Sequence, residues 1–82
     1  MDWEDIGFIK ASYIREGILK QLRKKTSTPK DLTEALDIHF PQISNNLKEM
    51  SERGLVQCLT ENRKKGKIYS ITDKGIEVLE KL

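Results

Sequence analysis

The organisation of this chain is clearest between Thr28 and Gly54, where the sequence reads TPKDLTEALDIHFPQISNNLKEMSERG. Thr28 followed by Pro29 is typical of a helix start, because threonine caps the first turn and proline is tolerated at the first helical position. Pro41 disfavours helical geometry at the preceding residue and suits the first turn of a new helix. The stretch therefore predicts two helices joined by a tight turn over residues 38–42.

The second of these helices is expected over residues 41–53, where apolar side chains recur at helical spacing and Gly54 suits a left-handed end. The expected buried positions are Ile43, Leu47 and Met50. The opposite face carries polar and charged residues: Gln42, Ser44, Asn45, Asn46, Lys48, Glu49 and Arg53. Asn and Gln can hydrogen-bond adenine edges, and Lys and Arg neutralise phosphates. This face is a candidate for reading a DNA groove, and the alternative is a polar outer face with no ligand, since amphipathicity alone gives the same spacing.

After Gly54 the pattern changes from that of a helix to that of strands. Residues 55–60 and 67–72 are predicted to form a hairpin with a basic tip. Its basic residues fall within six positions: Arg63, Lys64, Lys65 and Lys67. The net charge of the whole chain is only +2, so the case for an anionic partner depends on this clustering. The alternative is a solvated tip that merely keeps the hairpin edge from associating.

Helices are also predicted on either side of this region. Residues 8–25 contain no proline and repeat apolar residues at helical spacing, which predicts one long first helix. Thr72 as the N-cap and Asp73 in the first turn begin a final helix. The predicted order is helix, helix, helix, hairpin, helix. We therefore expect a mainly α fold with a small β-hairpin, as a single domain over residues 1–82.

This order is that of a winged helix-turn-helix, in which the third helix enters the major groove of DNA. The fragments that support a family assignment are Ser12-x-x-Arg15-x-x-Ile18-Leu19, Thr28-Pro29-x-x-Leu32, Ile43-Ser44-x-x-Leu47, Gly54-Leu55-Val56 and Arg63-Lys64-x-Gly66-Lys67-x-Tyr69-x-Ile71-Thr72-x-x-Gly75. In their order and spacing they resemble winged-helix transcriptional regulators of the ArsR/MarR-like kind, particularly small archaeal ones. The resemblance covers roughly residues 12–82.

The resemblance implies a sequence-specific DNA-binding transcriptional regulator. It places the base and phosphate contacts of the third helix at Gln42, Ser44, Asn45, Asn46 and Lys48. It also implies that a basic wing, residues 62–67, lies on the adjacent backbone or minor groove through Arg63, Lys64, Lys65 and Lys67. Lys30 is a further phosphate candidate, because the N-terminus of a helix favours anions. Glu49 and Glu52 on the third helix oppose this interpretation and favour a competing one, a winged helix that docks protein in a larger assembly.

The N-terminal stretch is richer in large apolar residues than the inward stripe of the first helix requires. A chain of this length buries only about 60–65% of its unfolded surface, so a second subunit would add stability. We expect a homodimer through the first and last helices, and the alternative is packing of these helices within one chain. The residues expected at this interface are Trp3, Ile6, Phe8, Ile9, Tyr13, Ile76, Leu79 and Leu82. A two-fold dimer would place its recognition helices about 34 Å apart.

Several classes of protein are disfavoured. Cys58 is the only cysteine, so neither an internal disulfide nor a paired-cysteine metal sensor is expected, and His39 has no second ligand nearby. With no phosphate-binding loop and no catalytic triad, we expect no enzyme activity and no cofactor or metal. A composition of 37% apolar and 34% charged residues disfavours a membrane span, and no signal peptide is apparent. The expectation is a cytoplasmic protein.

Overall fold

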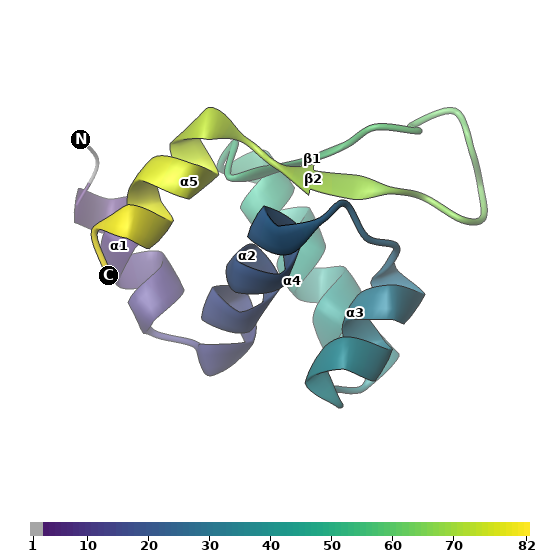
Figure 1. Cartoon of the computed structure of the whole chain (residues 1–82), viewed down its shortest axis with the longest axis horizontal. Helices are drawn as coiled ribbons and strands as arrows, with labels where there is room; N and C mark the ends of the chain where they lie inside the picture. The colour runs from purple at the N-terminus through teal and green to yellow at the C-terminus, as the bar shows by residue number, and fades with distance from the viewer. Residues whose placement is uncertain (1–2) are drawn as a thin grey trace.

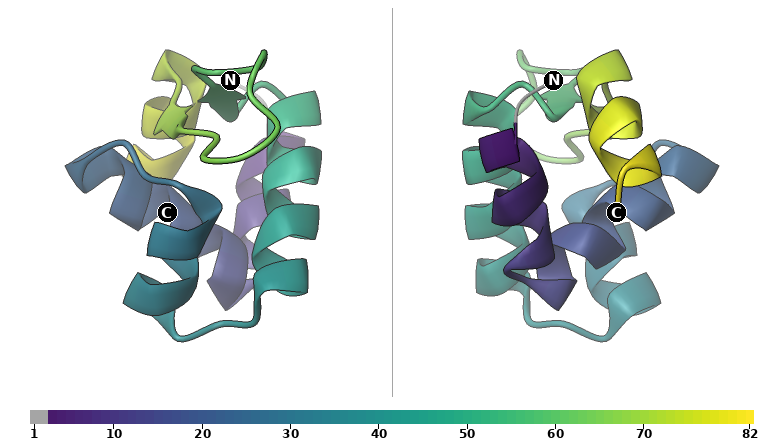
Figure 2. Two further views of the ribbon diagram at one scale, coloured as in Figure 1. Left: turned by 90° about the vertical axis from the view of Figure 1, so that its right-hand side faces the viewer. Right: turned by 90° about the vertical axis from the view of Figure 1, so that its left-hand side faces the viewer.

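The structure, a computed structural model, describes residues 3–82, which form five helices and two strands (Figure 1). In chain order the elements are α1 (Trp3–Lys10), α2 (Tyr13–Lys24), α3 (Pro29–Leu36), α4 (Phe40–Glu52), β1 (Val56–Cys58), β2 (Tyr69–Ile71) and α5 (Asp73–Glu80). The predicted fold class, mainly α with a small antiparallel hairpin, is confirmed. The two views of Figure 2 place α3 and the hairpin loop at one end of the molecule and α1 and α5 at the other.

The prediction of one long first helix was wrong, because the helix is interrupted between α1 and α2. Ser12 has extended backbone angles (φ −145°, ψ 119°), and its hydroxyl accepts a hydrogen bond from the backbone N–H of Arg15. Serine in this arrangement caps a new helix and stops the preceding one from continuing. The apolar spacing runs through the break without interruption, so periodicity alone does not reveal it.

The turn between α3 and α4 forms where it was predicted, but α4 starts and ends one residue earlier than the predicted range of 41–53, so that Phe40 is already helical. Thr28 and Asp31 make a reciprocal capping box, in which each side chain accepts a hydrogen bond from the backbone N–H of the other at 3.0 Å. The hydrogen bond from the backbone N–H of Thr28 lowers the pKa of the Asp31 carboxyl below its ordinary value. The hydrogen bond with the hydroxyl of Thr28 lowers the pKa further, to a smaller extent. The helix ends at Asp37 in a left-handed conformation (φ 55°), and α4 begins at Phe40.

The hydrophobic core is centred on α2, which packs against every other helix and against β2. The three positions predicted to face inward on α4 are buried, as are the apolar residues that recur at helical spacing along α2: Ile43, Leu47 and Met50, and Ile14, Ile18, Leu19 and Leu22. From α1, Ile6 and Ile9 join the same cluster. The recognition helix proposed from the sequence is therefore fixed against the centre of the molecule along its inner face.

The strands are shorter than the six residues predicted for each. Only three pairs form the ladder, Val56 with Ile71, Gln57 with Ser70 and Cys58 with Tyr69. Beyond them the N–H of Leu59 still donates to the carbonyl oxygen of Ile68 at 2.7 Å, and the N–H of Ile68 donates to the hydroxyl of Thr60 at 3.0 Å. The loop of residues 59–68 therefore extends from the body of the protein, with the basic wing within it (Figure 1).

Gly54 and Gly75 allow the backbone geometry on either side of the hairpin. Gly54 follows α4 with φ +75°, as its predicted left-handed role requires. Thr72 caps α5 through the N–H of Gly75, and its hydroxyl lies 2.6 and 3.0 Å from the carbonyl oxygens of Gly54 and Leu55. Gly75 is buried so close to Leu55 that a Cβ would overlap the carbonyl oxygen of Leu55. Over residues 3–82, none of the helices has the length and apolar character needed to cross a membrane.

Candidate nucleic-acid interface

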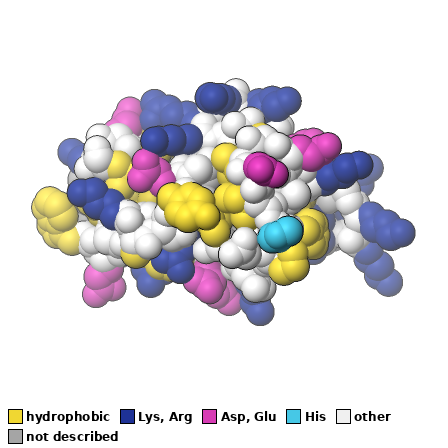
Figure 3. All heavy atoms as spheres, turned by 90° about the horizontal axis from the view of Figure 1, so that it is seen from below, with side chains coloured by type: hydrophobic (Ala, Val, Ile, Leu, Met, Phe, Trp, Pro, Cys, Tyr) yellow, Lys and Arg dark blue, Asp and Glu magenta, His cyan; other side chains and the backbone are white. Residues whose placement is uncertain are grey.

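A groove separates the start of α4 from the basic wing. Its volume is about 610 Å³, and lysines come to it from two directions, Lys30 at the start of α3 and Lys64, Lys65 and Lys67 of the basic wing. From α4, Ser44 lines the same groove. The structure therefore brings together five of the residues proposed from the sequence for DNA contact. Figure 3 shows Lys and Arg side chains gathered at the end of the molecule where the hairpin loop lies.

The other proposed DNA contacts lie outside this groove. Gln42, Asn45 and Lys48 are exposed on α4. Arg63 lies in the hairpin loop, where it lines a second, smaller cavity of about 450 Å³. The candidate surface therefore continues from the groove along the outer face of α4.

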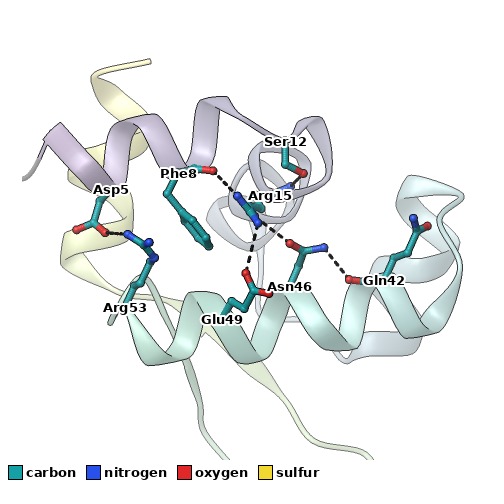
Figure 4. Close-up of polar contacts among 8 residues, drawn as sticks. All are labelled: Asp5, Phe8, Ser12, Arg15, Gln42, Asn46, Glu49 and Arg53. Atoms are coloured by element: carbon teal, nitrogen blue, oxygen red, sulfur yellow. Dashed lines mark hydrogen bonds and ion pairs between the residues drawn. The ribbon is translucent and has the colours of Figure 1, made fainter.

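Asn46 differs from its neighbours, because its side chain is used inside the protein. Its Oδ1 accepts a hydrogen bond from Nε of Arg15 at 3.0 Å, and its Nδ2 donates to the carbonyl oxygen of Gln42 at 2.8 Å. Figure 4 shows the amide directed from α4 toward Arg15. One hydrogen bond at each end of the amide therefore fixes its orientation between Arg15 and α4.

Arg15 also offsets part of the negative charge that the acidic residues place on the helix proposed to enter DNA. Its Nη2 lies 3.3 Å from Oε2 of Glu49, and its Nη1 donates to the carbonyl oxygen of Phe8 at 2.8 Å. Because the guanidinium is held by several partners at once, the cation stays beside the Glu49 carboxylate. The negative charge of Glu49 is thereby partly compensated on the face of α4 that was proposed to meet DNA.

A second arginine fixes the other end of α4 to α1. Nη1 of Arg53 lies 3.2 Å from Oδ1 of Asp5, a carboxylate whose side chain is only 3% exposed. The opposite oxygen of Asp5 lies 3.0 Å from Nζ of Lys74 in α5. Phe8 lies between the guanidinium groups of Arg15 and Arg53, whose central carbons are 3.8 and 3.9 Å from its ring centroid (Figure 4). These contacts join α1, α2 and α5 to the helix that carries the candidate surface.

Sequence reasoning did not identify this arginine network. Asp5 and Arg53 are 48 positions apart, and Arg15 and Glu49 are 34 positions apart. Helical spacing reports only neighbours three or four positions apart, so no local pattern indicates these pairs. A further missed residue is Phe40, which lines the groove and is 53% exposed. The signal available for Phe40 was its place beside Pro41, at the start of the helix proposed to enter DNA.

The residues proposed for a dimer interface fall into different environments. Ile6 and Ile9 are buried within the chain, so for these two the alternative of intramolecular packing describes the structure. Phe8 is held between two arginines, and Ile76 and Leu79 are half-buried. Trp3 and Tyr13 are 78% and 80% exposed, and Leu82 is 36% exposed. An apolar surface for a second copy therefore depends on these last three residues.

Two further titratable residues, Tyr69 and His39, are not among the residues proposed for DNA contact. Burial raises the pKa of the Tyr69 hydroxyl, and the neighbouring Cys58 adds to the rise, so this hydroxyl at the groove remains neutral at physiological pH. His39 is exposed at the N-cap position of α4 and makes no capping hydrogen bond through its side chain. Within residues 3–82, no three His, Cys, Asp or Glu side chains are grouped so that they could hold a metal ion.

Comparison with known proteins places this fold in a family. Residues 10–82 match the winged helix-turn-helix family. A curated relative, described as the uncharacterized HTH-type transcriptional regulator YdgG of Bacillus subtilis, is 38% identical over 69 residues, which cover 79% of this chain and 45% of YdgG. The chain therefore spans less than half the length of that relative.

Solved structures of ZitR from Lactococcus lactis have the same fold. A mutant of ZitR with one cysteine replaced by serine superimposes with a TM-score of 0.76 at 25% identity, covering 85% of this chain and 49% of ZitR. The same mutant in complex with DNA gives a TM-score of 0.74 at 26% identity, covering 88% of this chain and 50% of ZitR. The match over residues 10–82 includes both helices of the turn and the hairpin. This chain belongs to the winged helix-turn-helix family.

Proposed function

We propose that this chain binds double-stranded DNA sequence-specifically as a transcriptional regulator of the ArsR/MarR-like kind, acting in the cytoplasm. The observation that supports this most strongly is the groove in which the first turn of α4 faces four lysines from α3 and the basic wing. ZitR, a structure of the same fold, has been solved in complex with DNA, and YdgG is described as a transcriptional regulator. In this proposal α4 enters the major groove and the basic wing lies on the adjacent backbone or minor groove.

The side chains divide into two roles. Lys30, Lys64, Lys65 and Lys67, with Arg63, contact phosphates, which raises affinity for any duplex and makes it sensitive to salt. The exposed side chains of α4, Gln42, Ser44, Asn45 and Lys48, contact base edges and set the sequence preference. Asn46 takes a positioning role, because its amide joins α4 to Arg15. Removal of Arg15 is then expected to expose the charge of Glu49 to DNA.

Selection of bound fragments from a pool of random duplexes tests this proposal. We expect one sequence to be enriched. Asn45→Ala should bind this duplex about as weakly as the parent binds a duplex with one base pair changed, since a bidentate contact is worth about 1–3 kcal/mol of discrimination. Glu77→Ala is the matched control, because Glu77 is a residue of α5 that is absent from the groove lining, and it should keep the selectivity of the parent. A pool that shows no enrichment after selection contradicts sequence-specific binding and favours the protein-docking alternative.

We also propose that the regulator acts as a homodimer that uses Trp3, Tyr13 and Leu82. Large exposed side chains on α1 and α2 are the support for this, because burying each aromatic residue would remove substantial apolar area from water. Sedimentation equilibrium of the parent should give twice the mass of the chain, and Trp3→Ala with Tyr13→Ala should shift it toward the monomer. An enriched site with two-fold symmetry would agree with the dimer. A parent that sediments as a monomer at every concentration would contradict it.

A further inference from the structure

Phe40 occupies an unusual place for a large apolar residue. It is the first residue of α4, it is 53% exposed, and it lies outside the buried cluster formed by the described residues. The other large apolar side chains of α4, Ile43, Leu47 and Met50, are buried in that cluster. Phe40 instead lines the groove together with Ser44, which is one helical turn further along. The start of α4 therefore presents an aromatic ring to the groove.

The groove combines this ring with positive charge. Between Lys30 on one side and the lysines of the basic wing on the other, its lining includes the apolar surfaces of Pro29, Phe40 and Tyr69. A DNA strand complements such a lining, because its phosphates suit the lysines and its bases carry apolar groups as well as polar edges. In the major groove the apolar group that a base exposes is the C5-methyl of thymine, and phenylalanine is among the residues that contact it. Recognition helices contact base edges through their N-terminal residues, which is where Phe40 lies.

We propose that Phe40 reads a thymine, by packing its ring against the C5-methyl group in the major groove while the lysines hold phosphates of the DNA. This inference rests on the proposed function and adds one specificity-determining residue to it. A phenyl ring neither donates nor accepts a conventional hydrogen bond, so it discriminates through the methyl group alone. The prediction is therefore that each copy of this chain distinguishes thymine from uracil at one position of its half-site.

Replacing thymidine by deoxyuridine tests the contact, since it removes the methyl group and leaves the pairing edge unchanged. Each thymidine of the enriched duplex is replaced in turn, and affinity is measured by fluorescence anisotropy. Burial of one methyl or methylene group corresponds to about a fourfold change in affinity. We expect a loss of that size with the parent at one position of each half-site, and no difference between the two duplexes with Phe40→Ala. Phe40→Leu, which keeps an apolar side chain, should retain part of the difference.

Leu59→Ala is the matched control, because Leu59 has nearly the same exposure (54%) but is not part of the groove lining. It should keep the full thymine preference of the parent. If Phe40→Ala does not fold, the reduced ratio with Phe40→Leu provides the same test. An enriched duplex at which no thymidine is sensitive, or a ratio that Phe40→Ala leaves unchanged, overturns the role of Phe40 and leaves the proposed function standing. Failure of the parent to select any duplex overturns both.

Discussion

Replacing Gly75 with alanine should destabilise the protein, because α5 meets the backbone of residue 55 at this point. A Cβ on Gly75 would overlap the carbonyl oxygen of Leu55 and would lie 2.7 Å from Cγ1 of Ile71. The carbonyl oxygen of Leu55 also accepts a hydrogen bond from the N–H of Thr72 at 3.2 Å and lies 3.0 Å from its hydroxyl. Relief of the overlap therefore requires α5 to move away from the core, or these hydrogen bonds to break.

The size of the effect follows from two opposing terms. Overpacking a core costs about 1–3 kcal/mol, and the upper value applies here because the blocking atom belongs to the backbone. Alanine is a better helix former than glycine by about 1 kcal/mol, which offsets part of that cost. The net loss in the free energy of unfolding is then about 2 kcal/mol. For a domain of this size the melting temperature should fall by roughly 8–16 °C.

Gly7→Ala is the matched control for this experiment. Gly7 lies in α1, and among residues 3–82 an added Cβ would meet nothing within 4 Å beyond its chain neighbours and the backbone of its own helix, so only the gain in helix propensity acts. That gain should raise the free energy of unfolding by about 0.5–1 kcal/mol. The assay is thermal unfolding followed by far-ultraviolet circular dichroism, at one protein concentration for all variants. A Gly75→Ala variant that melts at or above the parent temperature would refute the close approach between α5 and residue 55.

Further predictions concern the α3 cap and the arginine network. Thr28→Ala removes one half of the capping box and should lower the free energy of unfolding in urea by about 1 kcal/mol, whereas Thr28→Ser should restore most of the loss. The pKa of Asp31 is lower in the folded chain than in the unfolded one, so its contribution is present at neutral pH and is lost as the pH falls through the folded pKa. Asp31→Asn should therefore melt below the parent at neutral pH, with a difference that shrinks below about pH 4; a constant difference would contradict the sign. Arg15→Ala should lower stability by about 2 kcal/mol and weaken DNA binding in low salt, and adding Glu49→Gln should restore the binding but not the stability. Binding that stays weak in the double variant would show that Glu49 does not act through its charge.

The parts of the fold that the sequence predicts correctly are set by contacts between near neighbours. Thr28 with Asp31, Thr72 with Gly75, and Gly54 at the end of α4 each satisfy backbone groups within a few residues, so the residue type at one position is enough to place the boundary. The missed boundary at Ser12 is also local. Ser12 caps α2 within an uninterrupted helical repeat of apolar residues, and the prediction of one helix followed that repeat.

The candidate site could be predicted only in part, for a different reason. Residue type and position indicated Ser44 and the lysines that line the groove. The use of Asn46 inside the protein depends on Arg15, which reaches it across a separation of 31 positions. Likewise, the exposure of Phe40 depends on how α3, α4 and the hairpin loop are placed relative to one another. Contacts of this kind follow from tertiary packing, which neither helical periodicity nor charge clustering contains.

The salt dependence of DNA binding tests the central claim most directly. Affinity for the selected duplex is measured by anisotropy over a series of salt concentrations, for the parent and for Lys64→Ala, Lys65→Ala and Lys81→Ala. Each phosphate contact contributes about −0.9 to the slope of log affinity against log salt. The two wing variants should each reduce the steepness by about that amount, and Lys81→Ala, at the end of α5, should leave it unchanged. A parent whose binding does not vary with salt, or wing variants whose slope equals that of the parent, would contradict binding of DNA by this face.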